Sequence, residues 1–74
     1  MYVLDITTKT GGRKEYVGRD SLPSLPAKGD VVQVEDTKEM AYVKAVQYCF
    51  RLEKSQGGHL GEVSFHYPRI WASE

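Results

Sequence analysis

Two runs of alternating apolar and polar residues, separated by a glycine-containing segment, constrain the fold of this chain more than any other feature. The first run covers residues 46–53 and the second covers residues 63–67, and in each of them every second residue is apolar. A period of two places successive side chains on opposite faces of a β-strand. We therefore expect a β-hairpin that closes across residues 54–61 and buries one face. The residues assigned to the core by this alternation are Val46, Tyr48, Phe50, Leu52, Val63, Phe65 and Tyr67.

The N-terminal residues predict a second hairpin. Every second position of residues 2–7 is apolar. The pair Gly11-Gly12 supplies a turn, and the chain after it runs back beside residues 2–7. If the two glycines form a two-residue loop, whose positive φ angles glycine adopts without strain, Ile6 lies opposite Val17.

A proline-containing connector leads from this hairpin to a third strand. A proline follows Leu22 and another follows Leu25, and each proline holds the preceding residue extended. We expect both leucines to cap the open end of the core, because two exposed leucines would be unusual in a small domain. Residues 31–35 are rich in valine and predict a short strand with Val32 and Val34 on one face.

Residues 37–55 allow two interpretations. Asp36 and Glu39 have the spacing of a capping box, and polar residues recur at helical intervals, so a helix packed on a small antiparallel sheet (an α+β fold) is the alternative. The density of aromatic and β-branched residues favours a strand instead. In that case Val43 and Val46 share a face only if a β-bulge lies between them.

These patterns predict an all-β fold, an SH3-like antiparallel barrel or strongly bent sheet of about five strands. A chain of 74 residues has room for one small domain, so residues 1–74 are expected to form a single unit. Pro68 cannot donate to a ladder and is expected to end the last strand, at an edge or at the exit of the sheet. Ile70 and Trp71 then either close the end of the barrel or face a partner.

Composition excludes several classes of function. Ten lysine and arginine residues balance ten aspartate and glutamate residues, so the chain lacks the diffuse positive field that drives non-specific binding to nucleic acid. Its single cysteine, Cys49, allows no internal disulfide and fits a reducing, cytoplasmic location. No apolar run approaches the roughly 20 residues that cross a bilayer, and no basic leader is visible, so we expect no membrane partner.

Few residues are able to perform chemistry. Cys49 and His66 fall on the polar face of the paired runs, and a register with Arg51 opposite Ser64 would bring them side by side. An activated thiolate there is the enzymatic alternative. No orienting acid or oxyanion donor accompanies the pair, so we predict no enzyme and no catalytic residue. Cys49, His59 and His66 match no zinc spacing, and we predict no metal and no cofactor.

The order of these elements resembles that of small SH3-like β-barrel proteins. The N-terminal hairpin, the Leu-Pro connector, residues 29–34 and the alternating residues 42–48 and 62–65 carry the resemblance. Proteins of this kind are encoded by bacteriophages and other mobile elements, and they often act as structural adaptors or as inhibitors of host machinery, including anti-defence proteins. The resemblance therefore implies an accessory protein that binds a host protein or itself, and it implies no catalytic residue.

The predicted function is that of a non-enzymatic binding module whose partner is a protein, with self-association as one form of it. Edge strands and the C-terminal residues 67–71 would supply the contact surface, through main-chain pairing and an aromatic anchor. The alternative is a small-ligand or nucleic-acid binder that uses the face of Arg51 and His66. The candidate binding residues are Arg51, His66, Arg69 and Trp71.

Overall fold

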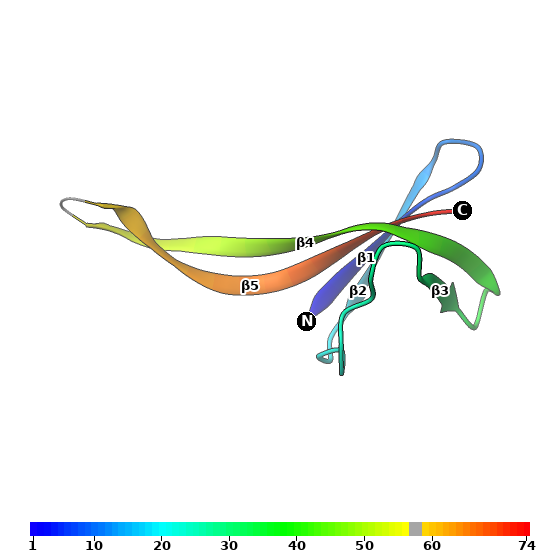
Figure 1. The fold of residues 1–74 in the computed structure, drawn as a ribbon, viewed down its shortest axis with the longest axis horizontal. Coiled ribbons are helices and arrows are strands. Elements are labelled where there is room, and N and C mark those ends of the chain that lie inside the picture. Colours follow the sequence, from blue (N-terminus) through cyan, green and yellow to red (C-terminus); the bar gives the residue numbers. More distant parts are fainter. Residues whose placement is uncertain (57–58) are drawn as a thin grey trace.

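The fold is one five-stranded β-sheet from which a long hairpin projects (Figure 1). The computed structural model describes residues 1–56 and 59–74, and within them there is no helix, so the helical alternative for residues 37–55 is wrong. The strands are β1 (Tyr2–Thr7), β2 (Arg13–Gly18), β3 (Val31–Val34), β4 (Glu39–Gln56) and β5 (His59–Ser73). Their order across the sheet is β2-β1-β5-β4-β3.

Neighbouring strands are antiparallel except for one pair. β1 runs antiparallel to β2, and β4 runs antiparallel to β3 and to β5, whereas β1 and β5 are parallel. The sheet curls into a half-barrel (Figure 1). The predicted fold class, five strands in a strongly bent all-β sheet, is therefore confirmed, but the parallel pair of β1 and β5 makes the sheet mixed and not antiparallel throughout.

Alternation of side chains divides the sheet into two faces. The inner face carries Ile6, Val43 and Ile70, which are at most 3% exposed. The outer face carries Asp5 and Trp71, which are partners in the parallel register of β1 and β5. The buried apolar residues of the described chain are Val3, Ile6, Ala41, Val43, Ile70 and Ala72.

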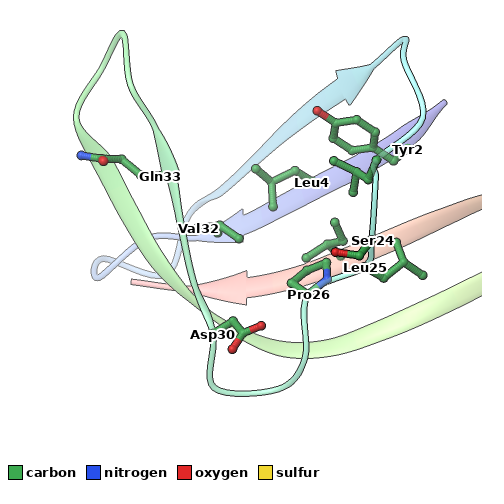
Figure 2. A pocket seen from close by; sticks show the side chains of 10 residues that line it. Tyr2, Leu4, Ser24, Leu25, Pro26, Asp30, Val32 and Gln33 are labelled. Carbon is green, nitrogen blue, oxygen red and sulfur yellow. The ribbon is translucent and has the colours of Figure 1, made fainter.

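The connector between β2 and β3 covers part of the inner face. Leu22 and Leu25 are half-buried and line a cavity of about 410 Å³ with Tyr2, Leu4 and Val32 (Figure 2). The two leucines are thus partly covered on the open side of the curled sheet, but a cavity separates them from the core.

The N-terminal hairpin forms, but its predicted register is wrong. Ile6 pairs with Lys14 instead of Val17. The loop is longer than two residues, and the side-chain oxygen of Thr8 accepts the N–H of Gly12 at 3.0 Å. Because this bond satisfies a backbone donor inside the loop, the ladder of β1 and β2 begins further from the two glycines than a two-residue loop would allow. Ile6 consequently lies on the inner face, while Val17 lies on the outer face and is 60% exposed.

A β-bulge in β4 places Val43 and Val46 on the same face, as predicted. The register of β4 against β5 shifts between Val43 and Ala45, so Lys44 is an extra residue. The bulge restores the alternation that would otherwise point Val46 away from the core.

β5 continues through Pro68, so the prediction that this proline ends the last strand is wrong. β5 pairs with β1 only from Arg69 to Ser73. At Pro68 the neighbour of β5 in the described sheet is therefore β4 alone. Proline is tolerated there because one edge of the strand is open.

Beyond the body of the sheet, β4 and β5 continue as a two-stranded arm, residues 48–56 and 59–68 (Figure 1). β3 pairs with β4 only up to Tyr42, and β1 pairs with β5 only from Arg69 onward. The molecule measures 50 by 26 by 19 Å. The arm accounts for much of the longest dimension, because nine residues of an extended strand span about 30 Å.

Candidate protein interface on the β4–β5 arm

The apolar face of the arm continues the inner face of the sheet. Phe50 pairs with Phe65, and Leu52 pairs with Val63. The exposed fractions are 57% for Tyr48, 58% for Phe50, 62% for Leu52, 61% for Val63 and 53% for Phe65. These five residues define the arm patch. The prediction that they belong to the core is wrong.

The arm patch is exposed because nothing in the described residues forms a second layer over it. The connector reaches only the base of the arm, where Leu22 and Leu25 form a groove of about 380 Å³ with Phe65 and Pro68. A sheet face buries its side chains only where another layer covers it. In this chain the connector covers part of the body of the sheet and reaches no further than the base of the arm.

The aromatic rings of the arm patch contact one another. The ring centroids of Phe50 and Phe65 are 5.7 Å apart in an edge-to-face arrangement, and those of Tyr48 and Phe65 are 6.2 Å apart. If a whole aromatic side chain offers about 200 Å², the five residues together expose on the order of 500–600 Å². A contiguous apolar patch of that size is at the upper end of what a monomeric protein exposes, and such patches are often functional.

A bulge in β5 separates two polar residues that the sequence pattern brings together. Arg51 pairs with Ser64 as predicted, but His66 is an extra residue in β5, so Cys49 pairs with Tyr67. Cys49 and His66 are therefore not cross-strand partners. Tyr67, which was predicted to belong to the core, is half-buried on the outer face opposite Cys49.

Two of the candidate binding residues, Arg51 and His66, meet on the arm. Nη2 of Arg51 lies 3.0 Å from Nε2 of His66. Because a guanidinium only donates, Nε2 is the acceptor of this hydrogen bond. Both side chains are exposed. Beside them, the Ser64 hydroxyl donates to the carboxylate of Glu53.

The other two candidates, Arg69 and Trp71, belong to a charged network on the outer face of the body. Asp5 is fully buried there and accepts hydrogen bonds from Arg13 and Arg69. Both guanidinium groups lie 5.3 Å from the ring centroid of Trp71. The indole N–H of Trp71 donates to Gln47 at 2.9 Å. Trp71 is thus half-buried and held by its own sheet.

The carboxylate of Asp5 organises this network electrostatically. The hydrogen bond from Arg13 lowers the pKa of Asp5 below its ordinary value, although burial opposes the shift. The hydrogen bond to Glu15 raises the pKa of Arg69, whose Nη1 lies 2.9 Å from Glu15 and 3.1 Å from Asp5. Because carboxylates of the same chain engage these guanidinium groups, the network compensates a buried charge.

A second buried carboxylate, Glu39, stabilises the curl of the sheet. The hydroxyl of Tyr16 donates to Glu39 at 2.9 Å, and Nζ of Lys14 lies 3.0 Å from the same carboxylate. The contact with Lys14 lowers the pKa of Glu39, and the hydrogen bond to Glu39 raises the pKa of Tyr16. β2 and β4 are not neighbours in the sheet, so these contacts span the inner face.

The described residues contain no group of three or more His, Cys, Asp and Glu side chains placed to hold a metal ion. The side chain of His59, which completes the set of three conceivable zinc ligands, lies outside the described part of the chain, as do residues 57 and 58 of the predicted hairpin loop.

Across residues 1–56 and 59–74, no helix has the length and apolar character needed to cross a bilayer.

No family model, no curated protein and no solved structure matches this chain. The resemblance to SH3-like proteins of bacteriophages and mobile elements therefore stays a prediction.

Sequence reasoning missed the arm patch because alternation shows which residues share a face, but not whether that face is covered. Strand length carries that information, but it emerges only in the structure, because the alternating runs of the sequence cover residues 46–53 and 63–67. β4 has 18 residues and β5 has 15, whereas strands usually have about five or six. Asp5 gave no signal, because in the sequence it is an ordinary polar position of an alternating strand.

Proposed function

We propose that this protein is a non-enzymatic protein-binding module and that the arm patch is its contact surface. The observation that carries the proposal is the uncovered apolar face of the arm, in which every side chain is more than half exposed. An apolar surface of this kind favours a partner that removes it from water. Aromatic residues grouped in such a patch are also the residues that concentrate binding energy in protein interfaces.

The backbone edges of the arm support the same proposal. Beyond Val43, whose backbone still bonds to Gly29 and Asp30, and before Arg69, the described parts of β4 and β5 pair only with each other. The outward N–H and C=O groups can therefore pair with an extended segment of a partner. Such pairing would place side chains of the partner beside the arm patch.

A nucleic-acid partner is less well supported. Arg13 and Arg69 are engaged by Asp5 and Glu15, and none of the five residues of the arm patch is cationic. Surfaces that bind single strands combine stacking aromatics with cations that neutralise phosphates. The arm patch supplies only the aromatic half of that combination.

Affinity capture with matched variants tests the proposal. Tagged wild-type, Phe50→Asp and Val17→Asp proteins are incubated with an extract of the cells from which the chain comes. Val17 is 60% exposed on the outer face of β2, so its variant carries the same new charge away from the arm. We expect wild type and Val17→Asp to retain the same protein and Phe50→Asp to lose it.

Circular dichroism establishes that all three proteins are folded. Two results would contradict the proposal: equal retention of the partner by Phe50→Asp, or retention of no protein, including untagged copies of the chain, by wild type.

A further inference from the structure

We infer that the partner of the arm patch is a second copy of this chain, seated face to face with the two arms antiparallel. The inference rests on the proposed function and adds the identity of the partner. A two-fold axis near Phe50 would set two identical patches against each other, as an isologous interface requires. Two sheets that meet in this way pack about 10 Å apart.

The distribution of side chains along the arm suits a two-fold arrangement. Tyr48 and Phe50 lie in the half of the patch nearer the body, and Leu52 and Val63 lie nearer the tip. Two residues of a strand span about 7 Å. With the axis at Phe50, Leu52 of one copy therefore lies over Tyr48 of the other copy, so aliphatic side chains meet aromatic ones.

The groove at the base of the arm receives the residues nearer the tip of the other copy. Leu22, Leu25 and Pro68 line this groove of about 380 Å³, which shares Phe65 with the arm patch. In the antiparallel arrangement, Leu52 of the second copy lies beside it. The chain thus carries both the protruding face and a groove that accepts it, in which Ser21 and His66 lie among apolar side chains.

The exposed area is sufficient for a specific dimer. Each patch exposes on the order of 500–600 Å², so closing two of them removes about 1,000–1,200 Å² from water before the groove residues are counted. Specific interfaces begin at about 1,200 Å² of total buried surface. A smaller patch would not bury this much surface, and a more polar patch of the same size would not bury this much apolar surface.

The charge distribution permits the contact. The net charge of the chain is zero, so two copies do not repel each other over long distances. The register places Arg51 and its partner Ser64 on the face of the arm opposite the patch. No charged side chain of the patch has to be desolvated when the two copies meet.

Sedimentation equilibrium over a range of protein concentrations tests the inference. We expect wild type and Val17→Asp to dimerise with similar dissociation constants. Phe50→Asp should weaken the dimer at least about 100-fold, because the two-fold axis brings both introduced carboxylates into an apolar contact. A wild-type protein that is monomeric at every concentration would overturn the inference, and so would a dimer that Phe50→Asp leaves intact.

Cross-linking tests the arrangement of the two copies. In a Cys49→Ser background, Phe50→Cys should be linked between copies by a short bismaleimide at least about tenfold faster than Arg51→Cys, whose side chains lie on the far faces of two packed sheets. Equal rates would refute the face-to-face arrangement.

Failure of the inference can be distinguished from failure of the proposed function. A monomeric wild type that still captures another protein through Phe50 leaves the protein-binding function standing and excludes the second copy as the partner. A monomeric wild type that captures nothing contradicts both.

Discussion

Alanine replacement of two isomeric side chains, Leu52 on the arm and Ile6 in the body, tests whether the arm lies outside the core. Both substitutions remove the same number of carbon atoms from a β-strand. Leu52 is 62% exposed, whereas Ile6 is 0% exposed. Any difference between the two losses of stability therefore reports burial and packing, not the chemistry of the side chain.

The expected magnitudes follow from these exposures. Full burial of a leucine or isoleucine side chain contributes about 1.5–3 kcal/mol. Leu52 has about two-fifths of that burial, so Leu52→Ala should lower the free energy of unfolding by about 0.6–1.2 kcal/mol. Ile6→Ala loses the full burial and leaves a cavity beside Ala41 and Ala72, so it should cost about 3–5 kcal/mol.

Urea unfolding, followed by the emission of the single tryptophan Trp71, measures both values. The measurement is repeated at several protein concentrations, because dimerisation would add a concentration-dependent stability that belongs to the interface. At the lowest concentration, equal losses for Leu52→Ala and Ile6→Ala would refute the reasoning. That result would mean that the arm is packed as a core.

Three further predictions concern the charged contacts and the tip of the arm. Asp5→Asn should lower the free energy of unfolding by about 2–4 kcal/mol at pH 7. Because the folded-state pKa of Asp5 is lowered, the carboxylate stabilises wild type above its unfolded pKa near 4, and this stabilisation is lost as the pH falls through the folded-state pKa. In urea unfolding at acidic pH, the free energy of unfolding of the variant should therefore change less with pH than that of wild type. Tyr16→Phe should cost about 1–2 kcal/mol in the same assay, because it removes the hydrogen bond to the buried Glu39; a neutral effect would contradict the role of this contact in the curl. Gly61→Ala should speed amide exchange in the arm but not in the body, because φ is 156° and the new Cβ would lie 2.7 Å from the backbone oxygen of Lys54. Unchanged exchange in the arm would contradict that geometry.

Much of the fold could be predicted because strand formation depends on local patterns. The period of two identified β4 and β5, and the requirement that Val43 and Val46 share a face predicted the bulge at Lys44. The pairing of Arg51 with Ser64 followed from the same alternation. Each of these features depends on residues close in sequence or on a single hairpin, so side-chain spacing suffices to predict it.

The parts of the site that escaped prediction depend on contacts between distant segments. Arg69 and Trp71 were recognised as candidate binding residues, but their contacts with Asp5 and Arg13 arise only when β5 lies beside β1. Arg51 and His66 were expected on one polar face, and they do meet. The bulge in β5 that leaves His66 without a cross-strand partner has no sequence marker. Alternation alone would have placed His66 opposite Cys49.

By itself, the sequence determined the strands, the hairpin of β4 and β5 and the residues that share its apolar face, because alternation is a property of neighbouring residues. Only the tertiary structure decided which part of that face is covered. The connector with Leu22 and Leu25 lies over part of the body and stops at the base of the arm. Tyr48 and Phe65 are therefore exposed, because burial requires a second layer and the described chain provides none beyond that point.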